Sequence, residues 1–395
     1  MYCTQVATKK GKKWVCVTDG PADPLTGKRN QVSRRGTTKK EAMKRVEDAI
    51  NKLSEHGLVH QTKEKITFEK LAKEWLNAYK VTGVKKSTVH LRSKQIKNLN
   101  KYLAKMTVSK ITPKMYQNIL NSLHTEESLA ESTIEGIHVT ASMIFEQAVI
   151  WGVITKSPTK SAKLPKKRVT VEELEKNTDP IAQKYLEKHE LKEFLNIVSE
   201  HGLTNDKAAL YILAFTGIRV GELCALKWDD VNFDQNEIKI TKTIFNPNNN
   251  MKNYDILTPK TTTSVRRVSI DTILVDMLRN HKAQQTKMRA LNKNDYHGNF
   301  VIANPNGYPY VIKKINVRVK RILKKTSITK KVTPHTLRHT HISMLAEAGV
   351  DLKTIMDRVG HKDMKTTMQI YTHVTEKMKK TADEKLKNYM EDIIR

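Results

Sequence analysis

Apolar and polar positions change their spacing along the chain, and these changes divide it into segments. In residues 1–60 the stretches YCTQVAT, KKWVCVTDG and KRNQVSRRG are separated by turns that contain Gly or Pro, which predicts three short strands. A helix is predicted to follow, because Thr38 and Glu41 match a capping box. Its apolar residues keep to one helical face, and they are Ala42, Val46, Ala49, Ile50 and Leu53.

Residues 66–160 carry apolar positions at helical spacing throughout. A stripe from Phe68 to Tyr79 predicts an amphipathic helix with its aromatic residues in a core. A second helix is predicted from about Ser87 to Leu103, a third from Thr112–Pro113, and a fourth from a capping box at Ser132 and Glu135. The fourth helix is expected to bury Ile137, Ile144, Phe145 and Val149.

The helical periodicity stops between Ser157 and Pro180, where prolines and the basic run in SPTKSAKLPKKRVT predict a linker. Beyond it, a buried helix over DKAALYILAF, strands around NEIKITKTIF and SVRRVSI, and further helices predict a mixed domain. We therefore expect a multidomain protein with four parts. These are a small N-terminal β-sheet plus helix domain (1–60), an all-α domain (66–160), a basic linker (161–180) and a mixed α+β domain with a C-terminal tail helix (181–395).

The excess of positive charge indicates what kind of partner the protein binds. Lys and Arg number 71 against 41 Asp and Glu, a formal charge of +30. Such an excess favours a polyanionic partner, most simply nucleic acid, although a basic solvated surface is the alternative. The N-terminal sheet could enter a DNA groove or dock on protein. The candidate DNA-binding residues are Arg92, Lys94 and Lys97 on the second predicted helix, and Lys166, Lys167 and Arg168 in the linker.

Apolar stretches and cysteines indicate the compartment. The stretch AALYILAF is far shorter than the roughly 18 residues of a membrane span, and the first residues lack the apolar centre of a signal peptide. We expect a soluble cytoplasmic protein without a membrane partner. Cys3, Cys16 and Cys224 are too few for a disulfide framework and are expected to pack. A zinc site of Cys3 and Cys16 with His56 and His60 is disfavoured, because zinc fingers usually pair cysteines at Cys-x-x-Cys spacing.

Several residues of the last segment have the chemistry needed to break a phosphodiester without metal. That reaction requires a nucleophile, cations for the non-bridging oxygens and an acid for the leaving oxygen. Arg219 follows the apolar run and the helix-breaking Gly217, and Glu222 can orient it. His335 and Arg338 stand three apart on a helix that Thr333–Pro334 opens and Gly349 closes, so both project from one face.

A histidine and a tyrosine follow in the string RVGHKDMKTTMQIYTH. His361 comes directly after Gly360, and Tyr371 lies on the next helix. A tyrosine there is by default a core residue; as a nucleophile it needs cations and a base, since about one free phenol in a thousand is ionised at pH 7. His335 and His339 also suggest a metal pair, but no third ligand is evident, so we predict no metal.

Four strings together resemble a known family. TGIRVGEL, TPHTLRHTHISMLAEAGV and RVGHKDMKTTMQIYTH, with Lys260 in TPKTTTSVRRV, make residues 185–375 similar to the catalytic domain of the tyrosine recombinase, or phage integrase, family. Val359 stands where leucine is usual in that family. The helical segment resembles the family's core-site-binding domain. The N-terminal sheet resembles, less specifically, the arm-site-binding domain of integrases of temperate phages and conjugative transposons.

The resemblance implies a role for each residue. Tyr371 attacks the scissile phosphate to give a 3′-phosphotyrosyl link, Arg219 and Arg338 clamp its oxygens, and Lys260 protonates the leaving 5′ oxygen. His335 and His361 assist proton transfer.

The resemblance also implies a biological role. The protein would be a site-specific recombinase that integrates and excises a mobile element in a bacterial host cell, associated with the nucleoid. It would need no cofactor. Implied partners are double-stranded DNA with core and arm attachment sites, a homotetramer on that DNA, and an excisionase or a host DNA-bending protein. A type IB topoisomerase-like strand transferase and a non-catalytic DNA-binding regulator are the alternatives.

The residues after Tyr371 predict one more surface. Leu386, Tyr389, Met390, Ile393 and Ile394 form the stripe of an amphipathic helix. This face is expected to fold back on its own domain or to dock on a neighbouring protomer, and exchange between four coupled sites favours the second.

Overall fold

The computed structural model describes residues 1–8, 11–22, 29–56, 66–166, 171, 179–259, 264–291, 296–360 and 364–394. Its contacts divide the chain into two compact units, Met1–Arg168 and Val169–Arg395, and each is described by itself. No helix of these described residues is long and apolar enough to cross a membrane.

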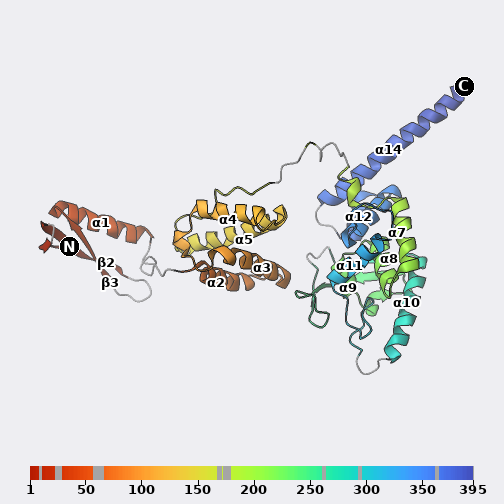
Figure 1. The fold of residues 1–395 in the computed structure, drawn as a ribbon, viewed down its shortest axis with the longest axis horizontal. Helices are drawn as coiled ribbons and strands as arrows, with labels where there is room; N and C mark the ends of the chain where they lie inside the picture. The colour runs from red at the N-terminus through yellow and green to blue at the C-terminus, as the bar shows by residue number, and fades with distance from the viewer. Residues whose placement is uncertain are drawn as a thin grey trace. The chain divides into compact units, whose positions relative to one another are not determined.

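The first unit begins with a three-stranded antiparallel sheet in the order β1-β2-β3, packed against one helix (Figure 1). The predicted strands and helix are confirmed. Thr38 accepts a hydrogen bond from the backbone of Glu41 at 3.2 Å, but the Glu41 carboxylate turns back to the backbone N–H of Thr37 at 2.7 Å instead of Thr38. The elements are β1 (Tyr2–Thr8), β2 (Gly11–Ala22), β3 (Arg29–Gly36) and α1 (Lys39–His56).

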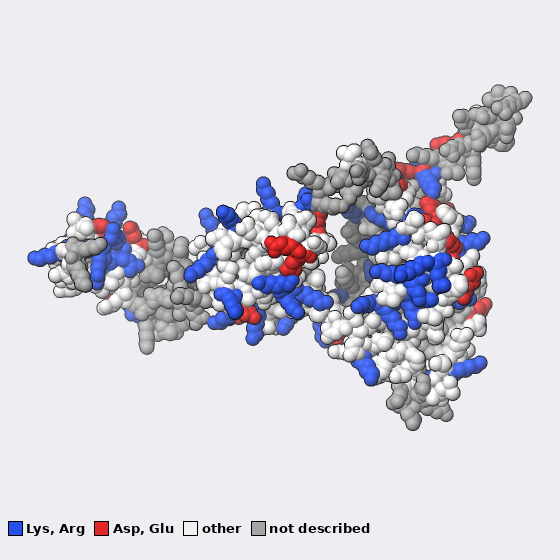
Figure 2. Space-filling model, in the orientation of Figure 1, with Lys and Arg blue, Asp and Glu red and all other residues white. Residues whose placement is uncertain are grey.

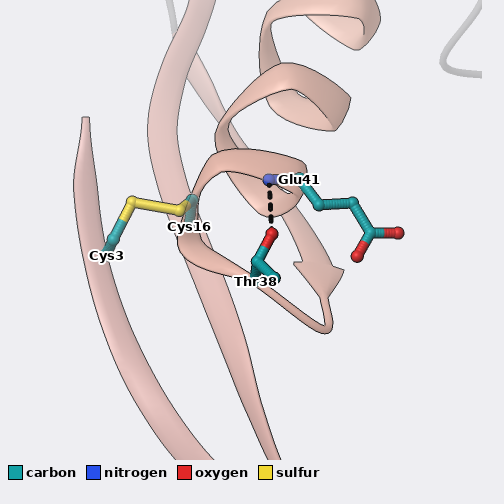
Figure 3. Close-up of a disulfide and its surroundings, with 4 residues drawn as sticks. All are labelled: Cys3, Cys16, Thr38 and Glu41. Carbon is teal, nitrogen blue, oxygen red and sulfur yellow. Dashed lines mark hydrogen bonds between the residues drawn. A yellow bond between two sulfur atoms is a disulfide. The ribbon is translucent and has the colours of Figure 1, made fainter.

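Cys3 and Cys16 form a disulfide between β1 and β2, which corrects the expectation that they pack as separate side chains (Figure 3). The antiparallel register sets them directly opposite each other, with their Cα atoms 4.0 Å apart. The spacing of the two cysteines is visible in the sequence but the register of the hairpin is not, so their pairing could not be predicted. Cys16 is fully buried beneath α1, in a small core with Ala42 and Val46.

Four α-helices and a short 3-10 helix of the described residues 66–150 surround a second core, which contains Phe68, Tyr116 and Phe145. The Thr112 hydroxyl caps the third helix by accepting from the backbone of Met115 at 3.3 Å, as predicted. The predicted N-cap of the fourth helix, Ser132, is wrong by two residues, because Ala130 occupies that position. Its first backbone N–H groups, of Thr133 and Ile134, bond the Ala130 carbonyl, so Ser132 lies inside the first turn. The elements are α2 (Phe68–Lys80), α3 (Lys86–Leu103), η2 (Val108–Lys110), α4 (Pro113–Thr125) and α5 (Glu131–Ile150).

Burial in the fourth helix follows the prediction except at its end. Ile137, Ile144 and Phe145 are fully buried, whereas Val149 is 36% exposed. Val149 lies in the last turn of α5, next to Ile150, which is exposed as well.

The second unit surrounds the apolar helix α8 (Asp206–Thr216), nearly all of which is buried. A three-stranded sheet in the order β4-β5-β8 and a two-stranded sheet β6-β7 accompany the helices. The strands predicted around NEIKITKTIF and SVRRVSI are confirmed as β5, β6 and β8. The other elements up to the last three helices are η3 (Ala182–Lys184), α7 (Lys188–His201), α9 (Val220–Ala225), η4 (Trp228–Asp230), β4 (Val231–Asn232), β5 (Glu237–Ile240), β6 (Thr243–Phe245), β7 (Asp255–Leu257), β8 (Arg266–Ser269), α10 (Thr272–Leu291) and α11 (Ile312–Leu323).

Three helices at the end of the chain share a smaller core with Tyr185, and this core contains Ile342, Val359 and Ile370. They are α12 (Pro334–Glu347), α13 (Leu352–Val359) and α14 (Met364–Ile394). Thr333 caps α12 and Pro334 occupies its first turn, as predicted. Tyr371 and the tail lie on one continuous helix of 31 residues. In the tail, Leu386 is 57% and Met390 52% exposed, so neither folds back on the unit.

Candidate active site

Arg219 lies at the entry to α9, where the left-handed Gly217 has ended α8. Its guanidinium donates to Glu222 at 2.9 Å, and its backbone N–H donates to the other carboxylate oxygen at 2.9 Å. Glu222 thus orients Arg219 as the sequence predicts. The Arg219 side chain is 37% exposed, which leaves part of the guanidinium free to meet a ligand.

Arg338 lies on α12 and is fully buried. It donates to the carbonyl of Gly217 at 2.6 Å and to that of Val359 at 2.6 Å. Burial, and then the charge of Arg219, lower the pKa of Arg338 well below its ordinary value. Gly217 is needed here, because a Cβ atom at its φ of +62° would lie 2.7 Å from the ring of His341. A larger residue at position 217 would therefore displace His341 and strain the turn that presents this carbonyl to Arg338.

The two arginines meet at the C-terminal end of α13. Arg338 holds the Val359 carbonyl, and Arg219 holds the next carbonyl, of Gly360, at 2.9 Å. Carbonyls at a helix C-terminus lack partners within the helix and carry partial negative charge, so they attract guanidinium groups. Residues from α9 and α12, about 120 positions apart in the sequence, are thereby brought to the segment that leads into His361.

His335 shares α12 with Arg338, and its side chain is exposed at the surface. Desolvation by the protein around it, followed by the charges of Arg338 and Arg219, lowers its pKa. The ring is therefore neutral at pH 7 and can accept a proton. Its centroid lies 4.4 Å from that of His339, a buried ring whose pKa is lowered to about 4, first by burial and then by His335. Within the described ranges, no cluster of three or more potential metal-ligating His, Cys, Asp or Glu side chains occurs.

Tyr371 is half-buried on α14 and packs against the core that contains Val359 and Ile342. Contacts on either side of it fix this part of the helix. Lys184 donates to Gln369 at 3.3 Å, and the Tyr185 hydroxyl bonds Nδ1 of His373 at 3.1 Å. Tyr371 therefore sits on a helix that is anchored to Lys184 and Tyr185 and that packs against α12 and α13.

Four of the predicted site residues, Lys260, His361, Lys167 and Arg168, lie outside the described residues. Among the other candidates for DNA contact, Lys94, Lys97 and Lys166 are exposed.

Arg92 differs from these, because it is half-buried and bonds to Gln95 at 3.1 Å and to Thr140 at 2.9 Å, which ties α3 to α5. Figure 2 shows Lys and Arg side chains spread over the visible face of each part of the chain, with a dense group on the second unit.

Sequence reasoning missed Arg266 and Arg358. Arg266 donates to the carboxylate of Glu222 at 3.0 Å, and Arg358 donates from Nε to Nε2 of the buried His341 at 3.0 Å. The sequence did contain a pattern that indicates a buried side chain at Arg266. In the strand SVRRVSI it has the same parity as Val268 and Ile270, both buried, so strand alternation places its side chain inward.

Comparison with known proteins agrees with this geometry. Residues 184–378 match the model of the phage integrase family, and residues 67–124 match the N-terminal SAM-like domain of phage integrases. The integrase of Staphylococcus phage L54a is 32% identical over 81% of this chain and 92% of its own length. The prophage ps2 probable integrase of Lactococcus lactis subsp. lactis is 33% identical over 90% of this chain and 92% of its own length.

Solved structures show the same fold at lower identity. The Tn1549 transposon integrase, in complex with a circular intermediate DNA, is 22% identical and gives a TM-score of 0.62 over 81% of this chain and 99% of that one. A lambda integrase tetramer bound to a Holliday junction is 18% identical, with a TM-score of 0.55 over 91% and 95%. The family match and the two relatives above 30% identity lead to one conclusion. The chain belongs to the phage integrase family of tyrosine recombinases, enzymes that cleave and join DNA strands in site-specific recombination.

Proposed function

We propose that this protein integrates and excises a mobile element, with Tyr371 as its nucleophile. One observation carries the residue assignment: Arg219 and Arg338 converge on the last carbonyls of α13, beside the helix that bears Tyr371. A phosphate under attack gains negative charge on its oxygens, and two forked guanidinium groups can stabilise that charge. The phage and prophage origins of its relatives support a mobile element as the substrate.

The cleavage step exchanges one phosphoester for another. The Tyr371 hydroxyl oxygen forms a bond to the scissile phosphorus as the bond to the 5′ oxygen breaks, and the phenolic proton passes to a base. Neutral His335 is suited to that role, and His361 assists it. Lys260 gives a proton to the leaving 5′ oxygen. The resulting 3′-phosphotyrosyl ester keeps the energy of the bond, so the 5′ hydroxyl of a partner strand can reverse the step without ATP or a metal ion.

Each part of the chain receives a function in this proposal. Residues 1–60 bind arm sites, residues 66–160 bind core sites, residues 161–180 form a basic connection, and residues 181–395 perform the chemistry. Lys94 and Lys97 in the helical part, and Lys166 in the basic connection, are exposed cations that support a DNA-binding role for both segments. Four protomers would assemble on paired sites, aided by an excisionase or a host DNA-bending protein.

Trapping the covalent intermediate tests the proposal. The substrate is a duplex with the element's crossover sequence and a nick next to the scissile phosphate, so that the released fragment diffuses away. Wild-type protein should accumulate a protein–DNA adduct, in EDTA as well as in magnesium. Tyr371→Phe should bind the same DNA but form no adduct, since it lacks one oxygen. A stable adduct from Tyr371→Phe would assign the nucleophile elsewhere, and an adduct that requires a metal would refute the metal-free mechanism.

A further inference from the structure

A third arginine contacts the end of α13 beside the two already described. Arg266, on β8, donates from Nε to the Arg358 carbonyl at 2.7 Å. The carbonyls of three successive residues, 358 to 360, are thus each held by a different arginine, namely Arg266, Arg338 and Arg219. Such an arrangement fixes the end of the helix against three separate elements.

Arg266 also shares a carboxylate with Arg219. Its NH2 group donates to one oxygen of Glu222 at 3.0 Å, while the Arg219 guanidinium donates to the other at 2.9 Å. The side chains of Arg266 and Glu222 are only 6% and 3% exposed. Burial raises the pKa of Glu222, but Arg266 and then Arg219 outweigh it and hold the pKa below its ordinary value. Glu222 therefore stays ionised and can direct Arg219.

The backbone next to His361 is shaped to receive Arg266. Gly360 has a φ of +67°, and a Cβ atom there would lie 3.2 Å from Cδ and from NH1 of Arg266. The guanidinium also donates to the Ser264 carbonyl at 3.0 Å, within its own segment. Arg266 consequently links β8, Glu222 of α9 and the end of α13 through one rigid group.

We propose that Arg266 is a positioning residue for DNA cleavage, which holds Glu222 and the end of α13 so that Arg219 and Arg338 meet the scissile phosphate together. This inference rests on the proposed roles of those two arginines. Arg266 itself need not touch DNA. Its removal should slow the chemical step by misplacing the two cations.

The test measures adduct formation at saturating nicked DNA with Arg266→Ala, Arg266→Lys and a control, Arg267→Ala. Arg267 is the next residue of β8, but its side chain is 60% exposed and pairs with Glu237 at the surface. Arg266→Ala should lower the rate by about 100-fold, a typical loss when a reacting group is misplaced by about 1 Å, with DNA affinity unchanged. Arg267→Ala should keep the wild-type rate.

Arg266→Lys tests whether a lower rate could result simply from unfolding of the variant. It keeps the buried charge opposite Glu222, so the variant should unfold at nearly the wild-type temperature. An ammonium cannot reproduce the fork that joins Glu222 to the Arg358 carbonyl, so its rate should fall between those of wild type and Arg266→Ala. A wild-type rate in Arg266→Lys would overturn the proposal.

A second substrate separates positioning of the cations from general support of the fold. A scissile phosphate with a methyl group in place of one non-bridging oxygen carries no charge, so it depends less on the arginines. The defect of Arg266→Ala should shrink on this substrate. An equal defect on both substrates would overturn the inference while leaving the proposed function intact, whereas a wild-type protein that forms no adduct would instead refute the proposed function.

Discussion

At the scale of single residues, the two arginines differ in how far they are buried, and this difference predicts different consequences of their loss. Arg219→Ala and Arg338→Ala should each slow adduct formation by about 100-fold or more, the size expected when a charge-stabilising donor is removed. Arg338→Ala should also destabilise the fold by about 1–3 kcal/mol, because the buried carbonyls of Gly217 and Val359 lose their donor.

Two measurements separate these effects. Urea unfolding gives the stability of each variant, and single-turnover cleavage gives its rate. Arg219, with its partly exposed side chain, should lose rate with little loss of stability. Normal cleavage by either variant would remove that arginine from the site.

At the scale of elements, α12 carries three histidines whose pKa values all lie below the ordinary value. Desolvation by the surrounding protein is the largest cause for each, and nearby charges add to it; the pKa of buried His339 is lowered to about 4 and that of buried His341 to about 3. Between pH 6.5 and about 4 the unfolded chain therefore binds more protons at His339 and His341 than the folded one. The stability that these two buried groups contribute is fully present above pH 6.5 and is lost as the pH falls, with a slope of about 1.4 kcal/mol per pH unit for each of the two.

His339→Gln tests this pH dependence, since glutamine does not titrate. The variant should lose less stability than wild type when the pH is lowered from 7 to 4.5, measured as the difference in urea midpoint. Parallel pH profiles would mean that His339 does not contribute. Both proteins contain the same carboxylates, so the effect of acid on those groups cancels when the stability changes of wild type and variant are compared.

Structural features could be predicted from the sequence where they depend only on residues close together in the chain. Caps such as Thr112 and Thr333, and the apolar run of α8, lie within a few neighbouring residues, so the sequence indicated them correctly. The Arg266–Glu222 pair joins residues 44 positions apart. Such a pair depends on tertiary packing, which neither residue reveals alone. The meeting of Arg219 and Arg338 was inferred only through resemblance to a family.

At the scale of the whole molecule, the N-terminal sheet and the catalytic unit are expected to bind different DNA. Deleting residues 1–60 should leave cleavage of a core site intact and impair recombination on long attachment DNA, since this segment contains none of the proposed catalytic residues. If the segment neutralises about four phosphates, its deletion should weaken the slope of log affinity against log salt on long DNA by about 0.9 for each of them. An unchanged slope would indicate that the segment binds protein.

The exposed tail predicts an assembly defect. Truncation after Lys379 keeps the pair between Lys377 and Glu187 at 2.9 Å, and it removes the exposed apolar residues Leu386 and Met390. The shortened protein should fold and bind one core site but fail to form a four-protomer complex on paired sites. Light scattering and native gels report the assembly. Tetramers of normal stability would show that the tail does not join protomers.

The continuity of α14 has a mechanical consequence. Tyr371 and Leu386 are 15 positions apart on one unbroken helix, which corresponds to about 22 Å at 1.5 Å per residue. The helix is held near one end, at Gln369 and His373, and its other end extends away from these anchoring contacts. A force on the far end is therefore transmitted along the helix to the anchored segment that carries Tyr371. The angle of helix α14 would then determine when strand exchange takes place.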